Sequence, residues 1–405
     1  MKKALLILII VTLQTSFAQW KSCNKGLICK NVWCIAISGN NIFAGTEEGI
    51  YFSSNNGNNW IAKNTGLTDT FIEALAIKEN NIFAGTKNGG VFLSTDNGDS
   101  WIAKNNGLSK TNIYGLFSYG NNIIAGIYHA GVFLSTNNGD DWITKNNGLT
   151  KLYIRCFAIY DNNIFAGSDG AAGIFLSTDN CDNWTQKNNG LTHPWVNSIA
   201  IIEDKIVAAT WGGGIFISSD NGDSWTAKNK GLNDIYLLTV ATGRDRIFAG
   251  THDKGIFLSK NNGESWAATN YGLTSLHVYS IALTDYHIFA GTYGGGIFRA
   301  WISDLITDVE EARLPENDII ISPNPASEYI EINIGADSRQ ETADGKKEIR
   351  IYNVFGECVI DLTPALVNTP LTPLERGIRV DVSGLAVGMY FVRYGSEIQK
   401  FVVVK

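Results

Sequence analysis

Short apolar runs alternate with polar turns rich in Gly and Asn over residues 20–300. In one copy of this pattern the apolar runs predict strands at Ile72–Ile77, Ile82–Thr86 and Val91–Ser94, and a fourth at Trp101–Lys104. Four short strands separated by such turns form one antiparallel sheet. Because the runs are apolar on both faces, each sheet needs cover on both faces, which neighbouring sheets in an array supply.

The pattern, about 41 residues long, recurs seven times, and six copies carry a near-identical eight-residue turn. The turns are Ser53–Trp60 (SSNNGNNW), Ser94–Trp101 (STDNGDSW), Ser135–Trp142 (STNNGDDW), Ser177–Trp184 (STDNCDNW), Ser218–Trp225 (SSDNGDSW) and Ser259–Trp266 (SKNNGESW). A fixed period of this length indicates a radial or linear repeat array.

Each turn has a structural role for its third residue, its glycine and its tryptophan. The short Asx side chain accepts backbone N–H groups, the glycine permits a positive φ, and the indole covers the turn. The structural Asx and Trp residues are Asn55, Trp60, Asp96, Trp101, Asn137, Trp142, Asp179, Trp184, Asp220, Trp225, Asn261 and Trp266. Cys181 replaces the glycine of the fourth turn, so we expect strain there and a gain of about 0.5–1 kcal/mol in Cys181→Gly.

The two ends of the repeat region complement each other. Trp20–Leu27 aligns with Trp60–Leu67 and supplies an outer strand without a sheet, whereas His287–Ala300 supplies the second and third strands of the last copy and then stops. Pairing the two ends gives seven complete blades and leaves no exposed sheet edge. We therefore predict an all-β fold with a seven-bladed β-propeller closed by its N-terminal strand. An open solenoid is the alternative, and it leaves Trp20–Lys25 unpaired.

The turns resemble the Asp-box, or BNR, repeats of sialidase-like and sortilin-like propellers, over about residues 20–300. This resemblance implies the fold but no single activity, because the family includes glycosidases, receptors and assembly factors. The arginine cluster, the Tyr–Glu pair and the Phe-Arg-Ile-Pro-type motif of sialidases find no matching positions. We therefore expect no sialidase activity and assign no catalytic residue.

Three loop positions per blade are predicted to surround the mouth of the central channel. The end of the first loop carries Asn31, Phe71, Asn112, Tyr153, Trp195, Tyr236 and His277; the start of the inner strand carries Trp33, Glu73, Tyr114, Arg155, Asn197, Leu238 and Tyr279; and the second loop carries Glu47, Lys87, Tyr128, Asp169, Trp211, His252 and Tyr293. The three tryptophans that lie neither in a turn nor at an end of the ring map here, as do four of the five histidines.

Aromatic rings with interspersed polar groups suit sugar faces or peptide side chains. The predicted ligand-binding residues are Trp33, Glu47, Glu73, Tyr114, Tyr128, Arg155, Trp195, Trp211, Tyr236, His252, His277, Tyr279 and Tyr293. The alternative is that these rings plug the channel or pack between blades.

Enzymatic and metal sites are less well supported. Glu47 and Glu73, on adjacent blades, are the least unlikely carboxylate pair for a glycosidase, but solvated loop carboxylates explain them as well. The histidines fall on different blades without a recognisable ligand spacing, so we expect no metal and no cofactor. With a net charge of −7 and a pI near 5.3, the chain is not expected to bind nucleic acid.

The first eighteen residues are predicted to be a secretory signal peptide. Lys2 and Lys3 precede the apolar run Ala4–Leu13, and Ser16 and Ala18 are small residues at the cleavage positions. The run is too short to span a bilayer, and no other stretch of the mature chain could span one. The mature protein is therefore expected outside the cell.

The remaining residues divide into an acidic linker, 303–318, and a β-rich segment, 319–405, after a propeller domain at 19–302. Four stretches, ISPNPASEYIEI, IRIYNVFGECV, LAVGMYFVRY and KFVVVK, resemble the C-terminal sorting domain of type IX secretion cargo of Bacteroidetes. The resemblance implies handling by the type IX secretion machinery and location outside, or on the outer membrane of, a Gram-negative bacterium. About seven short strands predict a small immunoglobulin-like β-sandwich. An ordinary sugar-binding accessory domain is the alternative.

These observations predict a secreted or cell-surface propeller that acts as a binding module for glycan or protein ligands. A glycoside hydrolase or lyase of the same superfamily is the alternative, and a structural adhesin is the third candidate.

Overall fold

The computed structural model describes residues 19–243, 245–305, 319–322, 329–334, 349–353, 358–361, 378–394 and 397–403. The chain divides into two compact units, Met1–Ile306 and Thr307–Lys405. The proposed signal peptide, 1–18, and most of the proposed linker lie outside the described residues, so these finer boundaries stay predictions. Among the described residues, no helix is both long and apolar enough to cross a membrane.

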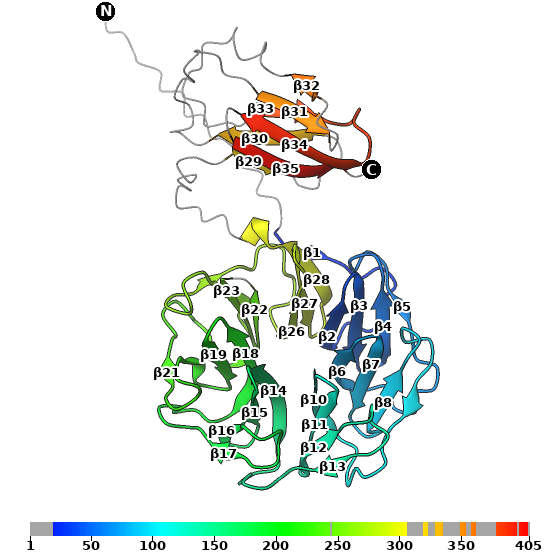
Figure 1. The fold of residues 1–405 in the computed structure, drawn as a ribbon, viewed down its shortest axis with the longest axis vertical. Helices are drawn as coiled ribbons and strands as arrows, with labels where there is room; N and C mark the ends of the chain where they lie inside the picture. The colour runs from blue at the N-terminus through cyan, green and yellow to red at the C-terminus, as the bar shows by residue number, and fades with distance from the viewer. Residues whose placement is uncertain are drawn as a thin grey trace, which may run out of the picture. The chain divides into compact units, whose positions relative to one another are not determined.

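The described part of the first unit is a ring of seven four-stranded antiparallel sheets, with the first strand of each blade facing the centre (Figure 1). Blade 1 comprises β2 (Val32–Ser38), β3 (Asn41–Thr46), β4 (Gly49–Ser53) and β5 (Ile61–Ala62); blade 2, β6 (Ile72–Lys78), β7 (Asn81–Thr86), β8 (Val91–Ser94) and β9 (Ile102–Ala103); blade 3, β10 (Ile113–Tyr119), β11 (Asn122–Ile127), β12 (Gly131–Ser135) and β13 (Ile143–Thr144); and blade 4, β14 (Ile154–Tyr160), β15 (Asn163–Ser168), β16 (Gly173–Ser177) and β17 (Thr185–Gln186). Blade 5 comprises β18 (Val196–Ile202), β19 (Lys205–Thr210), β20 (Gly214–Ser218) and β21 (Thr226–Ala227); blade 6, β22 (Leu237–Gly243), β23 (Arg246–Thr251), β24 (Ile256–Ser259) and β25 (Ala267–Ala268); and blade 7, β26 (Val278–Leu283), β27 (His287–Thr292), β28 (Gly296–Trp301) and β1 (Lys21–Ser22). A 3₁₀ helix, η1 (Ser303–Leu305), follows the ring.

The N-terminal strand closes the ring as predicted. Strand β1 pairs antiparallel with β28, with Lys21 opposite Arg299 and Ser22 opposite Phe298. The indole Nε1 of the buried Trp20 donates to the carbonyl oxygen of Thr269 in blade 6 at 2.6 Å. The propeller is therefore a closed ring, and the open solenoid is wrong.

In all six eight-residue turns the third residue accepts a backbone N–H through its side-chain oxygen, and the fifth residue has a positive φ. In the second turn the Ser100 N–H donates to Asp96 Oδ1 at 2.9 Å, and Gly98 has a φ of +86°. The hydroxyl of Ser100 and the turn N–H lower the pKa of Asp96 to about 2. Ser94, whose role the sequence did not reveal, accepts the Gly98 N–H at 2.8 Å. Since the bonds are local, the eight residues specify their own conformation.

The turn tryptophans also fasten neighbouring blades together. Each turn Trp donates its indole N–H to a backbone carbonyl oxygen one blade earlier, at 2.7–2.9 Å; the acceptors are Cys23, Lys63, Lys104, Lys145, Lys187 and Lys228. Trp20 makes the seventh bond of this type. The indoles therefore bridge every pair of neighbouring blades.

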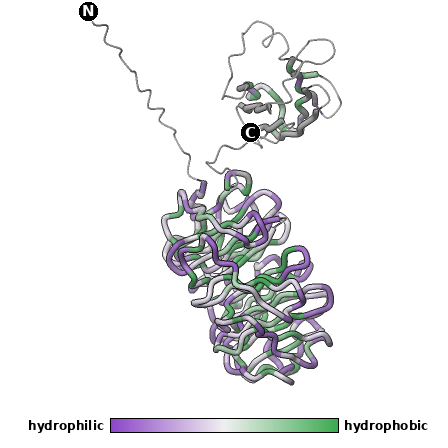
Figure 2. Tube along the Cα trace, turned by 90° about the vertical axis from the view of Figure 1, so that its left-hand side faces the viewer, coloured by the Kyte–Doolittle hydropathy of each residue, from purple (hydrophilic) through white to green (hydrophobic). Residues whose placement is uncertain are grey.

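Side chains of the second and third strands fill the spaces between blades. Hydrophobic stretches alternate with hydrophilic turns along the ring (Figure 2). The third residue of the second strand is phenylalanine in five blades, Ile124 in blade 3 and Val207 in blade 5, and all seven side chains are almost fully buried. A Cβ added at Gly98 or Gly222 would approach such a phenylalanine of the preceding blade, at 3.5 and 3.3 Å.

Cys181 has the expected backbone strain, but its side chain is better packed than the sequence suggested. Its φ of +70° is unfavourable for a side chain, as predicted. The side chain, however, is fully buried in the same cluster as Ile124, the smaller residue that replaces phenylalanine in the preceding blade. The thiol therefore fills space that Ile124 leaves, and the expected net gain from Cys181→Gly no longer follows.

The described part of the second unit contains seven strands in two antiparallel sheets. One sheet comprises β29 (Ile319–Ser322), β30 (Tyr329–Ile334) and β33 (Ile378–Asp381); the other comprises β32 (Cys358–Asp361), β31 (Ile349–Asn353), β34 (Gly388–Tyr394) and β35 (Glu397–Val403). Their number agrees with the seven or so short strands that the sequence predicts for this segment. The immunoglobulin-like assignment stays a prediction.

Candidate binding face

A β-bulge places one side chain per blade at the start of the inner strand. In blade 1 the register passes from Val32 opposite Thr46 to Cys34 opposite Gly45, so Trp33 is the extra residue. The same shift recurs in every blade, and the extra residues are Trp33, Glu73, Tyr114, Arg155, Asn197, Leu238 and Tyr279. Bulges redirect side chains and are over-represented beside active sites. They coincide with the predicted inner-strand positions.

The two predicted loop positions lie together in each blade. The Trp211 N–H donates to the Trp195 carbonyl oxygen at 2.9 Å, and five other blades have the same bond at 2.8–3.0 Å. In blade 1 the side-chain amide of Asn31 donates to Glu47 Oε2 at 3.0 Å instead. All three predicted positions of a blade therefore belong to one local structure beside the inner strand.

Aromatic side chains connect these positions across five blades. We call this set the aromatic arc; its members are Tyr236, Trp211, His252, His277, Tyr279, Trp33 and Phe71. Successive ring centroids are 5.1, 5.1, 4.1, 4.8, 4.2 and 5.4 Å apart. Seven residues at the predicted loop and inner-strand positions of blades 5, 6, 7, 1 and 2 are thus connected ring to ring.

A second aromatic group lies on blades 3 and 4. Tyr128 contacts Tyr114 and Tyr153 with ring centroids 4.8 and 5.3 Å apart. The Arg155 guanidinium lies 5.6 Å from the centroid of the Tyr114 ring and pairs with Asp169 at 3.5 Å. This group is polar enough to provide hydrogen bonds as well as apolar contact.

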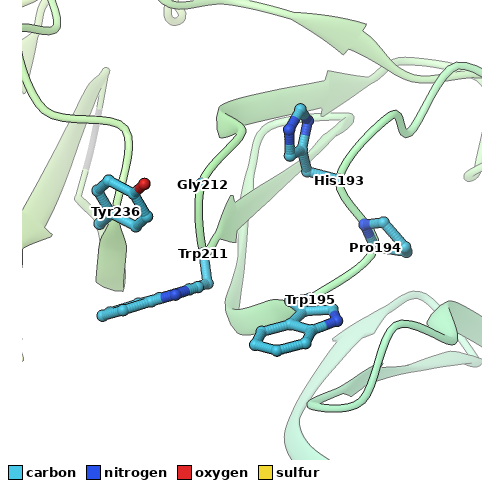
Figure 3. Close-up of a pocket in the computed structure, with 6 residues that line it drawn as sticks. All are labelled: His193, Pro194, Trp195, Trp211, Gly212 and Tyr236. Carbon is cyan, nitrogen blue, oxygen red and sulfur yellow. The ribbon is translucent and has the colours of Figure 1, made fainter.

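An open pocket of about 370 Å³ lies at the blade 5 end of the aromatic arc (Figure 3). Its lining is His193, Pro194, Trp195, Trp211, Gly212 and Tyr236. Trp211 and Gly212 lie between Tyr236 and the loop that carries Trp195. The side chains of Trp195 and Tyr236 are 45% and 46% exposed, although they are large and apolar. His193, Pro194 and Gly212 were not among the predicted ligand-binding residues; His193 was only mapped to the same face, and Pro194 and Gly212 carry no functional side-chain group.

The pocket has a rigid backbone. Trp211 and Tyr236 form an antiparallel β-bridge, and the Gly212 N–H donates to the Ile235 carbonyl oxygen at 3.0 Å. Gly212 has a φ of +93°, which a residue with a side chain rarely adopts. The backbone that carries Trp211 is therefore joined directly to the loop that carries Tyr236.

Trp33 and Tyr279 are packed rather than open. Their rings are 4.2 Å apart, and neither side chain is among the strongly exposed ones. In this part of the aromatic arc the rings therefore pack against each other, as the alternative to ligand binding proposed. Even so, the buried Trp33 Nε1, Asn112 Oδ1 and His277 Nε2 have no hydrogen-bond partner among the described residues. Unpaired buried polar atoms cost about 1–3 kcal/mol each, so three at one face are unusual.

The carboxylates of the face differ in environment. Burial raises the pKa of Glu73, although Arg155 and Lys87 oppose the shift, while Glu47 is held by the side chain of Asn31. Glu73 is thus a predicted site residue whose carboxyl pKa is raised by burial. Perturbed carboxyl groups occur at functional sites but also in structural networks.

Residues 321–405 match the secretion system C-terminal sorting domain. This confirms the predicted sorting domain and its resemblance to type IX secretion cargo. The protein is a seven-bladed β-propeller with a C-terminal sorting domain. It is a secreted or cell-surface protein of the Bacteroidetes type.

Several solved propellers have the same fold. The chain superimposes on YCF48 bound to D1 peptide with a TM-score of 0.57 at 13% identity, covering 72% of this chain and 98% of that one. PorZ, a surface component of the type IX secretion system of Porphyromonas gingivalis, gives 0.56 at 14% identity, covering 93% and 60%. The extracellular domain of a B. thetaiotaomicron protein gives 0.60 at 13% identity, covering 96% and 59%. No curated protein matches the chain.

Proposed function

We propose that the propeller is a binding module that holds a glycan or protein ligand at the channel face, with the Trp195–Trp211–Tyr236 pocket as its main contact. The observation that carries the proposal is the open pocket with half-exposed aromatic rings on a rigid backbone. Large apolar rings left in water are costly unless a partner covers them. Its volume of about 370 Å³ lies in the range typical of small-ligand sites.

A glycan is the first ligand to test. The C–H faces of a sugar ring pack on aromatic side chains, while the imidazole of His193 and the hydroxyl of Tyr236 provide hydrogen bonds to its rim. An open, shallow site suits one or two residues of a longer chain rather than an enclosed metabolite. A peptide is the second ligand, since YCF48, which has a similar fold, was solved with a peptide bound.

Export supports the same proposal. A protein that carries a sorting domain meets its ligand outside the cell, where polysaccharides and foreign proteins are abundant. We further propose that the eight-residue turns are Asp-box turns and that residues 319–405 engage the type IX machinery. The hydrogen bonds of the turns support the first of these assignments.

A glycoside hydrolase is the second candidate, and the raised pKa of Glu73 favours it. A general acid needs a raised pKa and a second carboxylate at about 5–10 Å. Glu47 is the candidate partner, and its electrostatic effect contributes to the shift. Binding is preferred because the open pocket contains neither carboxylate.

A glycan array combined with a reducing-sugar release assay tests these candidates. We expect binding without release by the mature protein, and loss of binding in Trp195→Ala/Trp211→Ala at an unchanged melting temperature. Tyr286→Ala is the matched control, because Tyr286 is 64% exposed but lies in the turn before β27, outside the predicted loops. Sugar release that depends on Glu73 would support the hydrolase instead. Neither binding nor release, with no peptide binding, would support the adhesin and contradict the proposal.

A further inference from the structure

Two histidines that the sequence separates by 25 positions meet at the channel face. His252 follows β23 in blade 6, and His277 precedes β26 in blade 7. Their ring centroids are 4.1 Å apart, and the carboxylate of Asp253 lies 2.9 Å from His252 Nδ1. One ligand atom from each of these three side chains lies within 4.8 Å of the other two. We propose that His252, Asp253 and His277 bind a divalent transition-metal ion of the zinc class.

The donor set fits such an ion. Imidazole nitrogen is a preferred ligand of Zn²⁺, Ni²⁺ and Cu²⁺, and two imidazoles with one carboxylate form a common three-ligand set. Hard cations such as Mg²⁺ and Ca²⁺ prefer oxygen ligands alone and are disfavoured here. Among the described residues, this is the one group of three or more His, Cys, Asp or Glu side chains with such proximity.

An unpaired atom points to the same conclusion. The Nε2 atom of His277 is buried and has no hydrogen-bond partner among the described residues. Aromatic packing alone explains the position of the two rings but leaves this nitrogen unsatisfied.

Neighbouring groups hold the backbone of all three residues and the rings of the two histidines in place. The His252 N–H donates to the Tyr236 carbonyl oxygen at 2.9 Å, and the carbonyl oxygen of His277 accepts from Tyr293 at 3.0 Å. The Asp253 N–H donates to Asp234 Oδ2 at 3.1 Å. Trp211 packs against the ring of His252, and Tyr279 stacks on His277. Supported ligands of this kind lose little freedom on binding a metal.

The three ligand atoms need to move only a short distance to bind an ion. Ligand atoms around a tetrahedral zinc ion with bonds of about 2.0–2.1 Å lie about 3.3 Å apart. The His252–Asp253 pair is already close to this value, and the side chain of Asp253 is 70% exposed and free to rotate. The ligand atoms of the three side chains lie within 4.8 Å of one another, so binding an ion requires them to approach by up to about 1.5 Å.

The ion would extend the binding face. Three protein ligands leave at least one coordination position for water or for a ligand oxygen. Because Trp211 lies beside His252, a sugar hydroxyl or a carboxylate in the pocket could coordinate an ion next to it. Metal binding itself depends only on the three side chains, so it stands even if the pocket binds no glycan.

Calorimetric titration of the chelator-treated mature protein with Zn²⁺ tests the proposal. The titration is done in a Cys358→Ser background, because this exposed free thiol could bind zinc by itself. We expect one ion per chain, and binding weaker by at least about tenfold in Asp253→Asn and in His277→Ala. His193→Ala is the matched control, since this exposed histidine lies on the same face but outside the group of three, and it should leave zinc affinity unchanged.

Co²⁺ provides an independent spectroscopic readout. The wild-type protein should give visible d–d bands on Co²⁺ addition, and Asp253→Asn, a surface change that leaves folding intact, should weaken them. Absence of heat and of d–d bands at millimolar metal overturns the proposal. Zinc affinity in Asp253→Asn and His277→Ala equal to that of the wild type also overturns it.

Discussion

Cys181 and Ile124 form a compensating pair, and a double-mutant cycle can test this. Five blades place phenylalanine where Ile124 lies, and five turns place glycine where Cys181 lies. Both residues are fully buried in one cluster. The cycle comprises Cys181→Gly, Ile124→Phe and the double variant, which restores the arrangement of Gly98 and Phe43 in blades 1 and 2.

The expected magnitudes follow from burial and backbone strain. Cys181→Gly relieves about 1 kcal/mol of strain at φ +70° but removes about 1–2 kcal/mol of buried contact, so its net effect is within about 1 kcal/mol of zero. Ile124→Phe alone overpacks the site and costs about 1–3 kcal/mol. In the double variant the ring occupies the space that the thiol leaves, so we expect a favourable coupling of about 1–2 kcal/mol.

Urea unfolding followed by tryptophan fluorescence measures the four free energies. Gly98→Cys is the matched control, because Gly98 has a φ of +86° and the sulfur would have to fit beyond a Cβ that already contacts Lys63 at 3.4 Å and Phe43 at 3.5 Å, so it should destabilise the ring. Effects of the two single changes that add within about 0.5 kcal/mol would refute the compensation.

Three further predictions concern pH, ring closure and export. Burial, with a contribution from Arg299, lowers the pKa of His287 to about 4, so the unfolded chain takes up a proton between pH 6.5 and 4 that the folded chain does not. Stability should therefore fall by about 2–3 kcal/mol over this range, and His287→Asn, the residue of four other blades, should remove that dependence in melts at pH 7 and 4.5. Trp20→Ala removes the indole that bonds to Thr269 and should cost about 3–5 kcal/mol in urea unfolding; a cost below about 1 kcal/mol would mean that this segment does not close the ring. Deletion of Leu385–Lys405 should retain the protein in the periplasm, as cell fractionation would show, whereas normal surface display would refute the sorting role.

Local chemistry made the turns and the ring predictable. The bonds of Asp96 and the φ of Gly98 involve residues at most four positions apart, so the sequence of one turn contains all of the information. Ring closure followed from counting strands, because an outer strand at one end matched a missing one at the other. Ser94 was overlooked because a serine hydroxyl can accept or donate in many conformations.

Contacts between blades were harder to anticipate. His252 and His277 were assigned to the correct face, but their proximity depends on the second loop of one blade meeting the first loop of the next. A comparison of these two positions in consecutive blades would have found the pair. The fit of Cys181 to Ile124 depends likewise on side-chain volume across a blade interface, which no pattern along one strand records.

The β-bulges could be predicted in part: their positions were found, but not their backbone geometry. Their positions were recognised because side chains such as Trp33, Glu73 and Arg155 break the repeat, but the extra residue in the strand was not foreseen. Backbone irregularities of this kind depend on the partner strand, and the apolar pattern of the inner strand continues through them.

Fluorine NMR of the 5-fluorotryptophan-labelled protein tests the central claim, that the ligand binds at the channel face. Each resonance is assigned by a Trp→Phe variant, and the protein is titrated with the oligosaccharide or peptide that binds it most tightly. The account predicts that the resonances of Trp195 and Trp211 shift to saturation while those of Trp60, Trp101 and the other turn tryptophans stay unchanged. Saturable binding that moves the turn tryptophans and leaves Trp195 and Trp211 in place would contradict it.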